Sequence, residues 1–292
     1  MNVQTVVKRL LVILVLAALL LTVTGCGLAR RGKSGFGANS YTSNDKVEVF
    51  KDIAYYDGST FNRNKHILDV YIPKKTKNFP TIFFVHGGAW VGGDKAQTAK
   101  FGMTLASHGI AVVDINYRLY PDVKYPRFVE DVARAFRWTM KNISKFGGDP
   151  GRIFVAGHSA GAHLVALIST NDRFLNKVGY SPNDILGTIA ISGIYRMDDK
   201  RFRRIFSDDK EDASPVYHVG KTTPPFLVFY ASNDIVDLDH QAELMAQALR
   251  KGNVPRELIR VKNRNHGSIL NKIGTENDPV LIDILRFIKK YD

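Results

Sequence analysis

Apolar residues along the chain fall into two patterns that alternate from about residue 46 to the end. Continuous apolar runs, typical of strands buried on both faces, occur at 81–85, 110–117, 153–156, 186–191 and 225–230. Apolar residues at helical spacing occur between and after these runs, at 95–107, 128–143, 160–168, 239–249 and 280–288. Strands that alternate with helices predict an α/β fold with a mostly parallel central sheet flanked by helices.

The two ends of this pattern differ from its middle. Strands are predicted at 47–50 and 67–72, with a further fragment at 53–56 and no helix between them, which predicts a short antiparallel start. A late strand is predicted at 257–261. Residues 195–219 are charged and irregular, and we expect them to form a small lid or insertion over the functional site.

The first 45 residues have a different character. Lys8 and Arg9 precede a run of about 14 apolar residues, which is short for the ~20 that a permanent membrane span needs. The sequence Val-Thr-Gly-Cys that ends at Cys26 resembles a bacterial lipobox, and Cys26 is the only cysteine. This resemblance implies a signal peptide at 1–25 and a lipid on Cys26; a flexible tether at 26–45 would lead to a catalytic domain at 46–292. We therefore expect a bacterial envelope protein, extracytoplasmic and lipid-anchored to a membrane.

A candidate nucleophile lies between a predicted strand and a predicted helix. Gly157 to Gly161 reads Gly-His-Ser-Ala-Gly, which matches Gly-x-Ser-x-Gly around Ser159. In this strand–turn–helix context the motif is typical of a nucleophile elbow, in which a sharp turn exposes the serine hydroxyl. The alternative is a Ser-Gly turn that merely opens a helix.

A second glycine turn follows the buried strand at 81–85. It reads His-Gly-Gly-Ala-Trp over residues 86–90. Closely spaced glycines let backbone N–H groups approach a developing oxyanion. The predicted oxyanion donors are Gly88, Ala89 and Ala160, with Gly87 as a further candidate. His86, which precedes the donors, is expected to be structural.

A serine nucleophile needs a base, and the base needs an orienting acid. His266 is the predicted base because it lies in a polar loop between the last predicted strand and the last helix; His218 and His240 are weaker alternatives. Asp234 is the predicted acid because it directly follows the strand at 225–230. Asp237 is the alternative acid.

Composition adds few constraints. The 292-residue chain has a formal charge of +13, and its Lys and Arg residues are scattered, which favours a solvated basic surface over nucleic-acid binding. No zinc-finger spacing, phosphate-binding loop or dinucleotide fingerprint is evident, so no metal or cofactor is expected.

Taken together, these motifs resemble the α/β-hydrolase carboxylesterases of the hormone-sensitive-lipase-like and acetyl-xylan and feruloyl-esterase-like branches. The resemblance extends over about residues 47–291 and implies the α/β-hydrolase fold, a Ser-Asp-His triad and hydrolysis of a small carboxylic ester through an acyl-enzyme. The His-Gly-Gly-x-Trp pattern is also similar to kynurenine formamidases, which implies an N-formyl amide as the alternative substrate. A lipase and a non-catalytic envelope scaffold are further alternatives. The sequence gives no prediction of oligomeric state.

Overall fold

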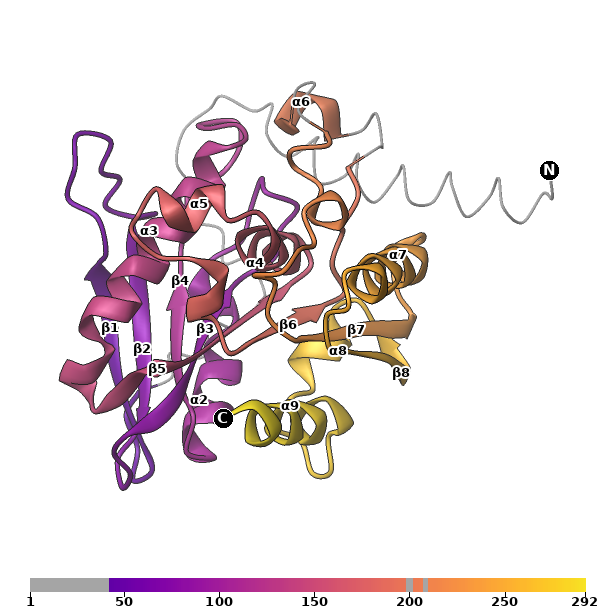
Figure 1. Ribbon diagram of the computed structural model, residues 1–292. Helices are drawn as coiled ribbons and strands as arrows, with labels where there is room; N and C mark the ends of the chain where they lie inside the picture. Colours follow the sequence, from indigo (N-terminus) through magenta and orange to yellow (C-terminus); the bar gives the residue numbers. More distant parts are fainter. Residues whose placement is uncertain (1–41, 198–201, 207–209) are drawn as a thin grey trace, which may run out of the picture.

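The computed structural model describes residues 42–197, 202–206 and 210–292. In this part of the chain, eight strands form one sheet in the order β1-β2-β4-β3-β5-β6-β7-β8 (Figure 1). Strand β2 (Ile67–Pro73) pairs antiparallel with β1 (Val47–Ala54) and with β4 (Ala111–Ile115). All other neighbouring strands pair parallel. The predicted parallel sheet with an antiparallel start is confirmed.

The remaining elements follow the predicted order closely. The other strands are β3 (Phe79–Val85), β5 (Gly148–His158), β6 (Gly187–Ile191), β7 (Phe226–Asn233) and β8 (Arg256–Asn265). The longer helices are α2 (Ala99–Ser107), α3 (Arg127–Asn142), α4 (Ala160–Thr170), α7 (Leu238–Lys251) and α9 (Pro279–Tyr291). Three short helices are α5 (Arg173–Asn176), α6 (Arg203–Phe206) and α8 (Ser268–Asn271). Helix α9 starts sharply because the Asp278 carboxylate accepts from two orphan N–H groups and Pro279 occupies the first helical position.

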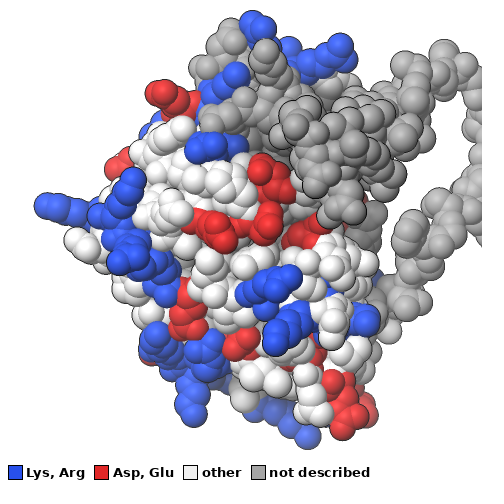
Figure 2. Space-filling view, turned by 90° about the vertical axis from the view of Figure 1, so that its right-hand side faces the viewer, with Lys and Arg blue, Asp and Glu red and all other residues white. Residues whose placement is uncertain are grey.

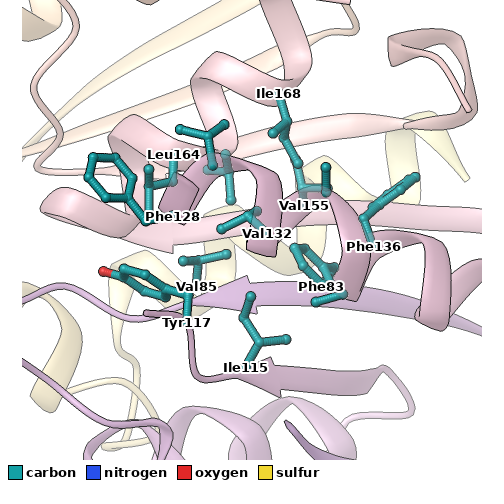
Figure 3. Close-up of a cluster of buried hydrophobic side chains, with 14 of the residues drawn as sticks. Phe83, Val85, Ile115, Tyr117, Phe128, Val132, Phe136, Val155, Leu164 and Ile168 are labelled. Carbon is teal, nitrogen blue, oxygen red and sulfur yellow. The ribbon is translucent and has the colours of Figure 1, made fainter. Parts of the chain in front are cut away.

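Alternate residues of the central strands point to opposite faces of the sheet, and each face is covered by helices. Phe83 and Val85 pack under α3 and α4, whereas Ile82 and Phe84 pack under α2, α8 and α9. Figure 3 shows the first face, where Phe128, Val132 and Phe136 of α3 and Leu164 and Ile168 of α4 meet the strands. This packing fixes α4, and with it the turn that precedes α4, against the middle of the sheet.

Three element boundaries differ from the prediction. The fragment at 53–56 is not separate, because Ile53 and Ala54 belong to β1; a register shift between Phe50 and Ile53 and the half-exposed edge position obscure the period. The predicted helix at 95–107 is a 3₁₀ turn at Lys95–Gln97 followed by α2. The last strand extends to Asn265, so His266 directly follows β8.

Strand β8 lies at one edge of the sheet, opposite β1, and its charges suit that position. Arg256, Arg260 and Lys262 are exposed along it. Charged side chains on an outer strand discourage pairing with a second chain. Figure 2 shows the side of the molecule that carries α7, β8 and α9, where cationic and anionic residues are interspersed.

Several sequence predictions lie outside the described residues. These are the signal peptide at 1–25, Cys26, most of the tether at 26–45 and parts of the predicted lid at 195–219. They stay predictions. Across the residues that the structure describes, no helix has both the length and the apolar character required to cross a membrane.

Candidate active site

Ser159 lies in the tight turn between β5 and α4. Its backbone has φ +56° and ψ −120°, a strained conformation for a residue with a side chain. The turn is possible because its flanking residues are glycines: a Cβ on Gly157 would lie 2.4 Å from the Gly161 backbone, and one on Gly161 would lie 2.0 Å from the Val85 carbonyl oxygen. A strained backbone at the serine and a glycine two residues away on each side are typical of a nucleophile elbow.

Three predicted residues from distant parts of the chain form a hydrogen-bonded line. The Ser159 hydroxyl lies 2.9 Å from Nε2 of His266. The Nδ1–H of His266 donates to Oδ1 of Asp234 at 2.7 Å. With Nδ1 protonated, Nε2 carries the lone pair that can accept the serine proton. The structure thus brings together Ser159, Asp234 and His266 in the order that a base-activated serine requires.

Asp234 is held as a carboxylate by several donors. Oδ2 accepts from the Ser192 hydroxyl at 2.5 Å and from the Ala231 N–H at 2.9 Å. Burial alone would raise the pKa of Asp234, but the donors from His266, Ser192 and Ala231 outweigh it and hold the pKa below the ordinary value. The carboxylate therefore stays ionised at neutral pH and fixes the tautomer of His266.

Ser192 is a site residue that the sequence analysis missed. It directly follows β6, is fully buried, and has φ +51°. Because β6 and β7 are parallel neighbours, residues after their carboxyl ends lie side by side. The signal available in the sequence was a serine directly after the predicted strand at 186–191.

The oxyanion loop, residues 86–90, follows β3 beside the elbow. Gly88 has φ +121°, and a Cβ there would lie 2.1 Å from the Gly92 carbonyl oxygen. Ala89 and Trp90 are also left-handed, with φ +52° and +61°. Within residues 42–197, 202–206 and 210–292, no acceptor pairs with the N–H groups of Gly88, Ala89 and Ala160. These three N–H groups are therefore available to a ligand. Gly87 packs directly on the elbow, since a Cβ there would lie 3.0 Å from Cβ of Ser159.

Trp90 ties this loop to α4 and to the predicted lid. Its Nε1–H donates to Nδ1 of His163 at 3.2 Å, and Nε2–H of His163 donates to the Ala213 carbonyl at 2.8 Å. The indole also meets Phe206 edge-to-face, with ring centroids 4.9 Å apart. The described part of 195–219 therefore packs against the oxyanion loop, while its opening and closing as a lid stay a prediction. The sequence analysis did not find this chain of contacts.

The remaining histidine and aspartate candidates lie outside the triad. His86 is buried, stacks on Tyr117 at 4.6 Å and has its pKa lowered to about 4 by burial, as suits a structural role. His218 binds the Asp212 carbonyl at 3.0 Å, and His240 is exposed on α7. Asp237 caps α7. Within the described residues, no group of three His, Cys, Asp or Glu side chains could hold a metal ion.

The chain resembles known esterases in both sequence and structure. The family model BD-FAE matches residues 68–195. Esterase LipC of Mycobacterium tuberculosis is 36% identical over 209 residues, which cover 63% of this chain and 52% of LipC. Isoprenylcysteine alpha-carbonyl methylesterase ICME of Arabidopsis thaliana is 28% identical over 88% of this chain and 66% of its own length. A truncated carbohydrate esterase from gut microbiota superposes with a TM-score of 0.74 at 20% identity, over 86% of this chain and 98% of that chain.

These comparisons and the sheet topology define the class. The chain has the α/β-hydrolase fold, and the proteins that it resembles are named as esterases, so the predicted fold and resemblance are confirmed. The chain spans 52% of the length of LipC, 66% of ICME and 58% of the probable carboxylic ester hydrolase LipM of Mycobacterium tuberculosis.

Proposed function

We propose that this protein is a serine carboxylesterase that hydrolyses a small carboxylic ester through an acyl-enzyme. The observation that carries the proposal is the line of hydrogen bonds from Ser159 through His266 to Asp234, beside three N–H groups that have no acceptor among the described residues. The resemblance to LipC and ICME, which are named as esterases, supports the reaction class.

The mechanism follows from the positions of these groups. His266 Nε2 takes the Ser159 proton as Oγ attacks the ester carbonyl, and the electron pair of the C=O bond moves onto oxygen. The N–H groups of Gly88, Ala89 and Ala160 hold that oxyanion, and one such donor contributes about 3–4 kcal/mol in comparable sites. His266 then gives its proton to the departing alcohol. Water, deprotonated by His266, releases the acid and restores Ser159.

The helix that follows the nucleophile contributes to the same charge. The N-terminus of α4 points at the reacting carbonyl, because Ala160 is its first residue and Ser159 precedes it. Unpaired N–H groups at a helix N-terminus stabilise negative charge. The positive end of α4 and the oxyanion loop thus both stabilise the oxyanion.

Hydrolysis of p-nitrophenyl acetate, butyrate and decanoate, beside N-formylkynurenine, tests the proposal on the full chain. We expect turnover of the two short esters, faster than the decanoate and faster than the formamide. The Ser159→Ala variant is the control for background hydrolysis. Turnover of the formamide alone would replace the ester proposal with the N-formyl amide alternative. No turnover of any substrate would leave a binding scaffold.

We further propose, from the sequence alone, that a lipid on Cys26 anchors the enzyme to a bacterial envelope membrane. Two acyl chains on one residue suffice for stable anchoring, whereas one gives marginal binding. In a bacterial host the full chain is expected in the membrane pellet, and the Cys26→Ala variant is expected to lose the lipid mass. An unmodified Cys26 in the intact protein would contradict the anchor.

A further inference from the structure

His158, the residue before the nucleophile, has a role that the mechanism above does not use. Its Nε2 lies 2.8 Å from the backbone carbonyl oxygen of His266. Its ring lies against the ring of His266, with centroids 4.6 Å apart and planes inclined by 40°. On its other side, Nδ1 lies 3.2 Å from the point where a Cβ on Gly87 would stand. His158 therefore lies between the base and the oxyanion loop.

The direction of the hydrogen bond fixes the tautomer of His158. A carbonyl oxygen only accepts, so Nε2 carries the proton and donates to the carbonyl of His266. Loss of hydration, together with the positive charge that His266 can carry, lowers the pKa of His158 to about 3. The ring is thus a neutral donor that adds no second positive charge beside the base.

The backbone of His266 lies one residue beyond the last paired position of β8, Asn265 with Asn233 of β7. His266 follows the outer strand β8, and its ring is 21% exposed. Apart from that strand pairing, Asn265 forms local hydrogen bonds with Ser268. Among the described residues, no donor other than His158 bonds the His266 carbonyl. The hydrogen bond from His158 links this outer segment directly to the nucleophile turn.

We propose that His158 is a positioning residue for the base: its Nε2–H holds the backbone of His266 so that the His266 ring stays within reach of both Ser159 and Asp234. This inference rests on the proposed function for its kinetic consequence, but its geometric content stands independently. A misplacement of about 1 Å in a catalytic group can cost roughly 100-fold in rate. The Ser159–Nε2 distance of 2.9 Å leaves little room for such a shift.

Substitution of His158 by two different amide side chains distinguishes a role as hydrogen-bond donor from a role that only fills space. The amide nitrogen of glutamine can occupy the position of histidine Nε2, whereas that of asparagine occupies the position of Nδ1. His158→Gln therefore keeps the donor to His266, and His158→Asn loses it at nearly the same polarity. We expect kcat for p-nitrophenyl butyrate to fall about 10- to 100-fold in His158→Asn with KM changed less than about 2-fold, and to stay within about 3-fold in His158→Gln.

A second measurement on the same full-length variants does not need turnover. The Nδ1 proton of His266, bonded to Asp234, gives a low-field proton resonance. We expect the resonance in the wild type and in His158→Gln, and its loss or broadening in His158→Asn. Circular dichroism of all three proteins checks that they are folded.

The outcomes are distinct. The proposal is supported if His158→Asn loses kcat or the low-field resonance while His158→Gln retains it. Equal behaviour of the two variants, whether both active or both impaired, overturns it. If the wild type hydrolyses no ester, the proposed function fails while the resonance still decides the role of His158.

Discussion

Replacing Ser159 with alanine, or His266 with alanine, is expected to lower kcat for a p-nitrophenyl ester by roughly 10⁴- to 10⁶-fold. The reason is that each residue makes the other useful: the hydroxyl is a weak nucleophile without the base, and the base has no proton to take without the hydroxyl. Asp234→Asn is expected to cost about 10⁴-fold, because the amide would favour the wrong tautomer of His266. Stopped assays at high protein concentration measure the residual rates.

The double variant gives the sharper result. If Ser159 and His266 act as one unit, the Ser159→Ala, His266→Ala protein is no slower than either single variant. Asp237→Asn is the matched control for Asp234→Asn, because the Asp237 carboxylate accepts from Gln241 of α7 rather than from His266. A single variant that kept more than about a tenth of wild-type activity would remove that residue from the mechanism, as would losses that simply multiply in the double variant.

Acid is expected to destabilise the protein through its buried neutral histidines. His163 is fully buried, and burial lowers its pKa from 6.5 to about 4. The unfolded chain therefore takes up a proton at this residue from about pH 6.5 downward, while the folded chain does so only near pH 4. Folding stability is highest above pH 6.5 and falls as pH drops, by about 1.4 kcal/mol per pH unit for this histidine. Burial also lowers the pKa of His86 to about 4, so this residue adds a similar dependence of folding stability on pH.

Urea unfolding between pH 7 and about pH 4.5 measures this slope, and His163→Gln isolates one histidine. Glutamine retains a donor toward the Ala213 carbonyl but has no group that titrates in this range. The free energy of unfolding of the variant is expected to fall less steeply than that of the wild type, by about 1.4 kcal/mol per pH unit. Asp114, whose pKa burial raises, acts in the opposite direction but equally in both proteins. Parallel slopes would show that His163 is not held neutral.

The fold was largely predictable because buried strands and amphipathic helices leave strong periods in the chain. The run at 81–85 and the helical stripe at 128–143 correspond to β3 and α3 almost residue for residue. The outer strand β1 was split in the prediction because one face is exposed and a bulge shifts its period. The predicted element boundaries were wrong where packing partners, rather than the local sequence pattern, decide the conformation.

The site was predictable where chemistry demands a local motif. The strained turn at Ser159 needs glycines on both sides, and these are adjacent in the sequence. Asp234 and His266 could be chosen because each follows a strand whose end lies at the same edge of the sheet. Ser192 directly follows β6, so its position was open to the same reasoning, whereas the contact of His158 with the carbonyl of His266, 108 positions away, follows no local motif. Such contacts exist only once the sheet has formed.

Covalent labelling of the full chain by a fluorophosphonate probe identifies the nucleophile itself, because the probe reacts with a serine hydroxyl that a neighbouring base activates. We expect one adduct, located on Ser159 by peptide mass spectrometry, absent from Ser159→Ala and formed far more slowly in His266→Ala. An adduct on a different serine, or equal labelling of the wild type and Ser159→Ala, would contradict the assignment of Ser159 as the nucleophile.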